Sequence, residues 1–270
     1  MPTIDDAGTT RPAAAPTQST TQSTTQSMTP PATPPRWVTT AWTLADPLRA
    51  DASGRDDASL NAEKIVAAAI ELADDEGLAA LSIRKLAGRL GAGTMAAYRH
   101  VDSRDDLVIL MVDTALGAPP SQILKTDAWR ERVTSWAMAI SARYARHPWL
   151  VDAPVAGFIA TPNRALWLEY ILQSLQPTGL SMRQMLEAAL LIDGHARSVA
   201  SLTRAVDAET GSHEGSQNVT PPWLASLFAG DRYPMLARVL SLEALDEESA
   251  RDLTFGLDRI IDGIAALATR

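Results

Sequence analysis

The chain has 270 residues, a formal net charge of −8 at pH 7, a hydrophobic content of 46% and no cysteine. This length allows one or two domains with a substantial core, and the lack of cysteine excludes a disulfide framework and thiolate metal sites. The four histidines are scattered without an i,i+4 pair, so we expect neither a metal site nor a cofactor. An acidic chain does not coat nucleic acid indiscriminately, but it leaves room for a local basic patch.

Composition and hydropathy also predict the fold class and the compartment. Alanine, leucine and arginine are abundant and strand-forming runs are scarce, which predicts an all-α fold. No apolar run approaches the length of about 18 residues that a transmembrane helix needs, so we expect no membrane partner. The N-terminus carries acids and lacks the apolar region of a signal peptide, and we therefore expect a cytoplasmic protein.

The first part of the chain divides into a tail and an extension. Residues 1–36 consist mainly of Thr, Ser, Gln, Pro and Ala, with the near-repeat TQSTTQSTTQS at 17–27, and we expect them to be disordered. Met28 offers an alternative start within this tail. Residues 37–58, with Trp37 and Trp42, form an N-terminal extension or linker. Two interpretations of it remain open: a short segment docked on the main body, which we favour, or an arm that reaches along DNA.

Four short helices are predicted next, in a small domain at 59–118. The first begins after Asn61, a good N-cap, with Leu60 and Ile65 placed as a hydrophobic staple, and Gly77 is a natural stop. The following helices are predicted at 82–90, 94–100 and 103–117, and two prolines at 119 and 120 close the domain.

The second and third of these helices form a predicted helix-turn-helix at about 82–101. Gly91 suits the turn because a positive φ costs glycine little, and Ala87 is small where the helices approach each other. The contact between the two helices is expected from Leu86, Leu90, Ala97 and Val101. Residues 82–104 hold five bases and one acid, a local net charge of +4 on an acidic chain. This combination predicts a motif whose second helix enters the major groove of double-stranded DNA.

The side chains of this motif divide by the part of DNA that they are expected to contact. Base edges are assigned to Thr94, Met95 and Ala96 at the start of the third helix, and a base or a phosphate to Arg84 and Arg99. Phosphates are assigned to Ser82, Tyr98, His100 and Arg104. A merely solvated helix face remains an equal alternative for Lys85 and Arg89.

The stretch IVAAAIELADDEGLAALSIRKLAGRLGAGTMAAYRHVDSRDDLVILMVD resembles the DNA-binding domain of the tetracycline-repressor (TetR) family of bacterial transcriptional regulators. The resemblance rests on EGL, LSIRKLA and LG, on a short helix ending in YRHV, and on the Ser-Arg-Asp start of the next helix. The segment FGLDRIIDGIAAL at 255–267 is similar to the last helix of the tetracycline-repressor-like subgroup. The resemblance implies an all-helical homodimer that binds a palindromic operator through the residues assigned above. Thr94-Met95-Ala96 stands where the tetracycline repressor has a polar Gln-Pro-Thr run, so we expect a different operator.

Residues 119–270 are assigned to a C-terminal ligand-binding and dimerisation domain. Its helices are expected at 127–146, 162–176, 181–206, 221–229, 232–243 and 247–269, with a loop at 207–222. The dimer interface is predicted on the apolar stripe of the last helix, part of which must meet the domain's own core: Leu253, Leu257, Ile260, Ile261 and Ile264.

A ligand pocket is predicted among the middle helices. Its candidate lining residues are Trp136, Met138, Tyr144, Trp167, Tyr170, Met185 and His195. A core position remains the favoured alternative for the aromatic residues, and a partner within the fold or at an interface for His195. Asp193 and Arg197 are spaced i,i+4 and are expected to bond each other.

The functional prediction is a ligand-responsive DNA-binding transcriptional regulator, and we expect a repressor rather than an enzyme. Its predicted partners are operator DNA, a second copy of the chain and an unidentified small molecule, and we expect it at the nucleoid when DNA-bound. Two alternatives stay open: a ligand-independent activator, and a helical small-molecule enzyme with an incidental helix pair. The sequence offers no G-x-S-x-G elbow, phosphate loop or paired metal ligands, which disfavours the enzyme.

Overall fold

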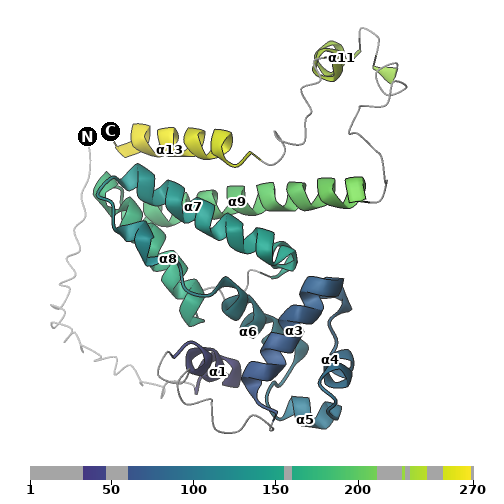
Figure 1. Cartoon of the computed structure of the whole chain (residues 1–270). Helices are drawn as coiled ribbons and strands as arrows, with labels where there is room; N and C mark the ends of the chain where they lie inside the picture. The colour runs from purple at the N-terminus through teal and green to yellow at the C-terminus, as the bar shows by residue number, and fades with distance from the viewer. Residues whose placement is uncertain are drawn as a thin grey trace, which may run out of the picture. The chain divides into compact units, whose positions relative to one another are not determined.

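The computed structural model describes residues 33–46, 60–154, 160–211, 227–228, 232–241 and 252–268. The described ranges contain helices and no strand, so the all-α prediction is confirmed (Figure 1). The predicted tail up to residue 32, residues 47–58 of the linker, the loop from 212 and most of the expected helix at 221–229 lie outside the described residues.

Three short helices form what we call the head: α3 (Ala62–Glu76), α4 (Ile83–Arg89) and α5 (Thr94–Tyr98). Asn61, the predicted cap of α3, accepts at Oδ1 from the amide of Lys64 at 2.8 Å, and Ser82, at the predicted start of the next helix, accepts at Oγ from the amide of Lys85 at 3.2 Å. A 3₁₀ turn, η2 (Leu78–Ala80), follows the positive-φ residue Gly77 at the end of α3.

Helix α6 (Arg104–Leu116) connects the head with the rest of the protein. It is buried on nearly every side, as expected of a helix that is apolar all round, and it packs against α3, α7 and α8. Helix α1 (Arg36–Leu44) also packs on α6 through the buried Ala41, so this part of the predicted tail and linker is a docked helix. The indole N–H of Trp42 donates to the carbonyl of Ala160 at 3.1 Å.

The body consists of α7 (Trp129–Arg146), α8 (Pro162–Leu175) and α9 (Met182–Gly211), which pack on one another. Helix α13 (Thr254–Ala268) lies along α9 and α7 (Figure 1). Three further 3₁₀ turns, η3 (Ser121–Leu124), η4 (Pro148–Asp152) and η5 (Gln176–Thr178), connect these helices, and α11 (Pro234–Ser241) follows α9 in the chain. None of the described helices combines the length and the apolarity needed to cross a membrane.

Two helix boundaries differ from the prediction. Helix α9 runs on to Gly211, into the predicted loop, because Ala208 and Glu209 are good helix formers and no strong breaker precedes that glycine. Helix α13 begins at Thr254 rather than at 247, since the carboxylate of Asp252 accepts from the amide of Thr254 at 2.7 Å and Leu253 is not helical. Short 3₁₀ turns such as η4 were not predicted because they carry no hydrophobic period.

Candidate DNA-binding motif and ligand pocket

The helix-turn-helix is built as the sequence predicts. Gly91, with φ of 62°, makes the turn, and an added Cβ there meets no atom within 4 Å. Leu86 and Ala97 are fully buried between the helices, and Val101 closes the end of the contact. Because α5 is only five residues long, these few apolar anchors fix its orientation on α4.

The side chains assigned to base edges lie on the exposed side of α5. Met95 is 76% exposed, and Thr94 is exposed beside it, while Ala96 is half-buried. Tyr98 and Arg99 are exposed at the end of the same helix, and His100 is half-buried. The structure therefore leaves this helix face open, as a recognition helix requires.

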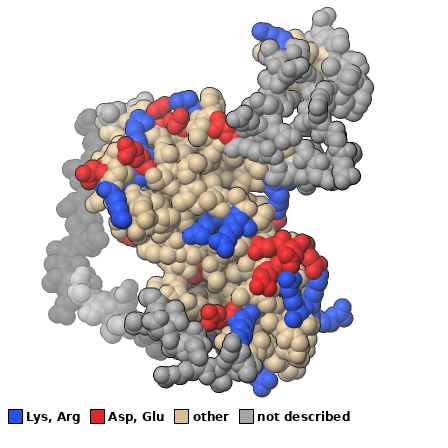
Figure 2. Space-filling view, viewed as in Figure 1, with Lys and Arg blue, Asp and Glu red and all other residues tan. Residues whose placement is uncertain are grey.

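Part of the positive charge of the helix-turn-helix is neutralised by neighbouring acids. Arg89 donates to Asp75 at 2.7 Å, and Lys85 bonds Glu76, so two of the five bases face acids at the end of α3. The first of these bonds is the main cause that raises the pKa of Arg89. Red and blue side chains adjoin over this part of the molecule in Figure 2. For Arg84 and Arg99, the described residues provide no acidic partner, so these two arginines carry the open positive charge.

Two residues near the motif have structural partners that the sequence does not reveal. Arg104 donates from Nε to the carbonyl of Leu81 and from Nη2 to that of Leu78, both at 3.0 Å. Its predicted phosphate contact would have to coexist with these bonds. Arg36 of α1 donates to Asp102 at 3.1 Å and to the carbonyl of Arg99, which places α1 at the end of the recognition helix.

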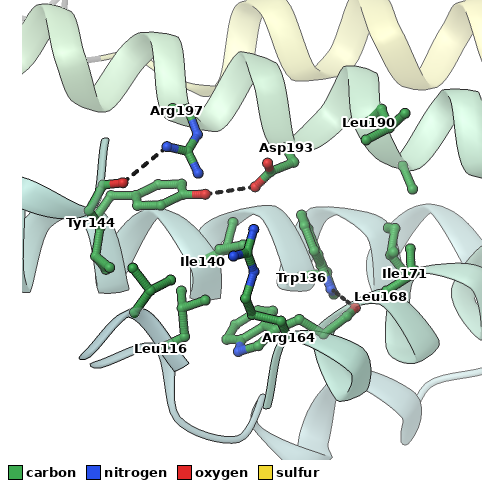
Figure 3. Close-up of a pocket in the computed structure, with 14 residues that line it drawn as sticks. Leu116, Trp136, Ile140, Tyr144, Arg164, Leu168, Ile171, Leu190, Asp193 and Arg197 are labelled. Carbon is green, nitrogen blue, oxygen red and sulfur yellow. Dashed lines mark hydrogen bonds between the residues drawn. The ribbon is translucent and has the colours of Figure 1, made fainter. Parts of the chain in front are cut away.

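A cavity lies between α6, α7, α8 and α9 in the body (Figure 3). Its walls are mainly apolar and aromatic, with Trp136 and Trp167 packed edge-to-face at 5.5 Å between ring centroids. The enclosed space is about 50 Å³, enough for a few water molecules, and the hollow measures about 580 Å³ when its opening to solvent is included.

Four polar side chains enter this apolar wall. Tyr144 donates its hydroxyl to Asp193 at 2.7 Å, and burial together with Asp193 holds the pKa of Tyr144 well above its usual range. Arg164 reaches up from α8 and Arg197 down from α9 (Figure 3). Arg197 lies over the Tyr144 ring at 5.3 Å from its centroid and donates to the carbonyls of Leu150 and Val151 at 3.0 and 3.2 Å. Burial lowers the pKa of Arg164.

The structure brings three of the predicted pocket residues to this cavity and leaves four elsewhere. Trp136, Tyr144 and Trp167 line it. Met138 is 50% exposed on another side of α7, and neither Tyr170 nor Met185 is part of the lining. Within the described part of α9, the predicted bond between Asp193 and Arg197 is not formed. Asp193 instead accepts from Tyr144, and Arg197 donates to carbonyls of η4.

His195 has a structural role instead of a ligand contact. Its Nε2 lies 3.0 Å from the carbonyl of Leu253, and its ring lies so close to Gly256 that a Cβ there would be 2.3 Å from it. His195 therefore holds α13 against α9.

The predicted dimer interface needs a similar correction. Leu257 is 1% exposed, and Leu253, Ile261 and Ile264 are also buried within the protomer, so these four side chains belong to its own core. Ile260 is partly buried. The apolar groups that α13 leaves open are Phe255, which is 69% exposed, and Leu267.

Hydrogen bonds tie the cavity to α6. The carboxylate of Asp113 on α6 accepts from the amides of Asn163 and Arg164 at 3.0 Å each, at the start of α8. Burial raises the pKa of Asp113. Trp167 donates its indole N–H to the carbonyl of Gly117, at the end of α6, at 2.8 Å. The helix that connects the head with the body is thus bonded to α8, which lines the cavity.

Two family models match this architecture. Residues 65–111, which cover the head and part of α6, match the model described as "Bacterial regulatory proteins, tetR family". Residues 123–268 match "Tetracyclin repressor-like, C-terminal domain", and this match alone covers more than half of the chain. The chain belongs to the tetR family of bacterial regulatory proteins. As a tetR-family member it is a helix-turn-helix DNA-binding transcriptional regulator, as predicted.

Individual tetR-family proteins are similar over most of the chain. The HTH-type transcriptional repressor DrrR1 of Streptomyces coeruleorubidus is 31% identical over 217 residues, which cover 78% of this chain and 80% of that protein. The structure of apo ActR from Streptomyces coelicolor has a TM-score of 0.64 at 26% identity and covers 78% of this chain and 98% of ActR. The complex of ActR with (S)-DNPA has a TM-score of 0.60 at 25% identity, over 78% of this chain and 100% of ActR.

Sequence reasoning missed the residues that link the cavity to its surroundings. Asp113 is an acid in an otherwise apolar helix, a pattern that indicates a buried partner. Leu150 and Arg164 carried no such signal, because their place in the cavity wall depends on how η4 and α8 pack.

Proposed function

We propose that this tetR-family chain is a repressor that binds a palindromic operator as a homodimer and leaves it when a small molecule enters the cavity. The observation that carries this proposal is the double role of α6. Val112 and Leu116 of α6 line the cavity, while Leu107 and Met111 of the same helix are buried in the core beside the head. A change in the cavity therefore acts on the helix that supports the recognition motif.

The size of the cavity supports a change of shape on binding. Because the enclosed space of about 50 Å³ holds only a few water molecules, a ring-containing ligand either occupies the open part of the hollow or pushes its walls apart. Leu116 and Trp167 lie in those walls, and Trp167 is bonded to the end of α6. The ligand then favours the state with the wider cavity, and the difference in its affinity for the two states sets the change in DNA affinity.

The lining favours a flat molecule with polar substituents. Aromatic walls suit stacked or edge-on rings, and Asp193, Arg164 and Arg197 offer both an acceptor and donors for hydrogen bonds. ActR, with the same fold, has been solved with (S)-DNPA, which supports a small-molecule effector for this chain as well.

The dimer is proposed to form through the open apolar groups of α9 and α13. Leu191, Leu202 and Phe255 are each more than half exposed, and a second copy of the chain would cover these side chains.

We place the protein in the cytoplasm and at the nucleoid when it is bound to DNA. Its family and its relative DrrR1 are regulators, and we assign no catalytic role to the chain. The cavity disfavours a ligand-independent activator.

Selection from a random DNA library tests the DNA-binding part of this proposal. The full chain should enrich an inverted repeat, and the logarithm of its affinity should fall linearly with the logarithm of the salt concentration. Arg84→Ala should relax base preference at one position of each half-site, at a cost of about 1–3 kcal/mol. Failure to enrich any sequence, even at low salt, would refute the proposal.

A further inference from the structure

A short turn of the body is bonded directly to α3 of the head. The carboxylate of Asp74, on α3, accepts from the indole N–H of Trp149 at 2.7 Å and lies 2.9 Å from Nδ1 of His147. Trp149 belongs to η4 and is 2% exposed, and His147, immediately before η4, is also buried. The side chain of Asp74 is 31% exposed, so water reaches the carboxylate, whereas both of its partners are buried. Bonds of this kind contribute more than exposed surface pairs.

The same turn forms part of the cavity wall. Leu150, the residue after Trp149, lines the cavity with a side chain that is fully buried. Its carbonyl and that of Val151 accept from Nη1 of Arg197, a lining residue whose guanidinium lies over Tyr144 (Figure 3). Because Trp149 and Leu150 are neighbours in one short 3₁₀ turn, a displacement of Leu150 also moves Trp149.

A continuous series of contacts therefore runs from the cavity to α3. It starts at Arg197, passes through the η4 carbonyls and Trp149, and ends at Asp74. This series is separate from the bonds of α6 to α8, which involve Asp113 and Trp167. Besides the contacts that α1 makes with both parts, the described residues thus attach the head to the body at α6 and at η4. The attachment at η4 and the one at α6 each include a residue that lines the cavity, or the chain neighbour of such a residue.

We propose that η4 is a second link between the ligand cavity and the DNA-binding head, with Trp149 and Asp74 as its positioning residues. A ligand that engages Arg197 or displaces Leu150 withdraws Trp149 from Asp74. With that attachment released, the head can turn about the attachments that remain at α6 and α1, which changes the placement of its recognition helix. This inference rests on the proposed function, since it describes how the same cavity regulates the same head.

Hydrogen exchange of the full chain tests the link without DNA and without a ligand. Arg197→Gln weakens the cavity end of the series, and Trp149→Phe removes the indole donor at the head end while keeping a ring. Both variants should speed exchange of the amides in the last two turns of α3 by about tenfold, the ratio that corresponds to one lost hydrogen bond. Trp129→Phe is the matched control, because it also replaces a tryptophan of the body by phenylalanine, outside the cavity lining and at the opposite end of α7 from η4. It should leave exchange of α3 unchanged.

Each outcome of this comparison decides the proposal. Faster exchange confined to α3 and its neighbours in the head, in both variants and not in the control, supports the link. Unchanged exchange of α3 in Arg197→Gln, or faster exchange spread evenly over the whole chain, would overturn it and leave the contacts a structural role only. If Arg197→Gln does not fold, Arg197→Lys, which keeps the charge but not the guanidinium, takes its place at the cavity end of the series.

A second experiment, which measures operator binding, distinguishes this inference from the proposed function. Trp149→Phe should weaken binding to the selected operator by about threefold to tenfold, with base preference and salt slope unchanged, because no DNA contact is lost. Unchanged affinity, or an altered salt slope, would contradict the link. If the wild-type chain selects no operator, the proposed function fails, whereas the exchange experiment still shows whether the cavity and the head are connected.

Discussion

Arg104 provides a sharp test because sequence and structure give it different partners. The sequence assigns it to a phosphate, but its guanidinium donates to the carbonyls of Leu78 and Leu81 at 3.0 Å each. A hydrogen bond that involves a charged group contributes about 1.5–3 kcal/mol. The Arg104 side chain is 42% exposed, so water replaces part of both bonds, and we expect Arg104→Ala to cost about 2 kcal/mol in total. For a protein of this size, that loss lowers the melting temperature by about 4–8 °C.

The assay combines thermal unfolding with binding to the selected operator. Arg99→Ala is the matched control, because Arg99 is exposed and the described residues give its side chain no acidic partner. The control should lose DNA affinity and about one unit of salt slope, with stability unchanged within about 0.5 kcal/mol. If Arg104→Ala melts at the wild-type temperature, the bonds to Leu78 and Leu81 do not hold the turn between α3 and α4, and our reading of Arg104 is wrong.

Four further predictions follow from single residues. Tyr144→Phe should lower the free energy of unfolding, measured by chemical denaturation, by about 1–3 kcal/mol, because Asp193 loses its donor. An unchanged free energy of unfolding would contradict this prediction and would mean that water replaces the lost donor. Gly91→Ala should cost about 1–2 kcal/mol in the same assay through its positive φ alone, and Gly91→Asn less. Gly256→Ala should displace α13, because its Cβ would meet His195 at 2.3 Å, and a variant as stable as wild type would contradict that packing. Burial raises the folded-state pKa of Asp113, so its contribution is complete below the unfolded pKa of about 3.9 and is lost as the pH rises through the folded value. The stability of wild type relative to Asp113→Asn should therefore increase as the pH falls toward that value, and a pH-independent difference would refute the assignment.

Local signals made the head predictable. Asn61 caps its helix as expected, Ser82 and Ser103 cap the helices that were predicted to start there, and Gly91 makes the turn. These features were predictable because a cap or a turn depends on a few neighbouring residues. The exposed face of α5 was predicted for the same reason, since Ala97 is the buried residue of that helix and its neighbours are left on the surface.

Long-range packing made the body less predictable. An apolar stripe such as Leu257 and Ile261 looks the same whether it meets the protomer's own core or a second copy, and here it meets the core. An isolated polar group such as His195 shows that a partner is needed but not which one, and its partner is a carbonyl 58 residues away. The paired state of Lys85 and Arg89 likewise depends on where α3 ends relative to α4.

The central claim is that a ligand in the cavity and the operator lower each other's affinity for the protein. It is tested most directly by measuring operator affinity with and without a small molecule that stabilises the protein against heat, and ligand affinity with and without operator. We predict that the ligand weakens operator binding by about 5–150-fold and that the operator weakens ligand binding by the same factor. A ligand that occupies the cavity and binds equally well to the free and the operator-bound protein would contradict the account.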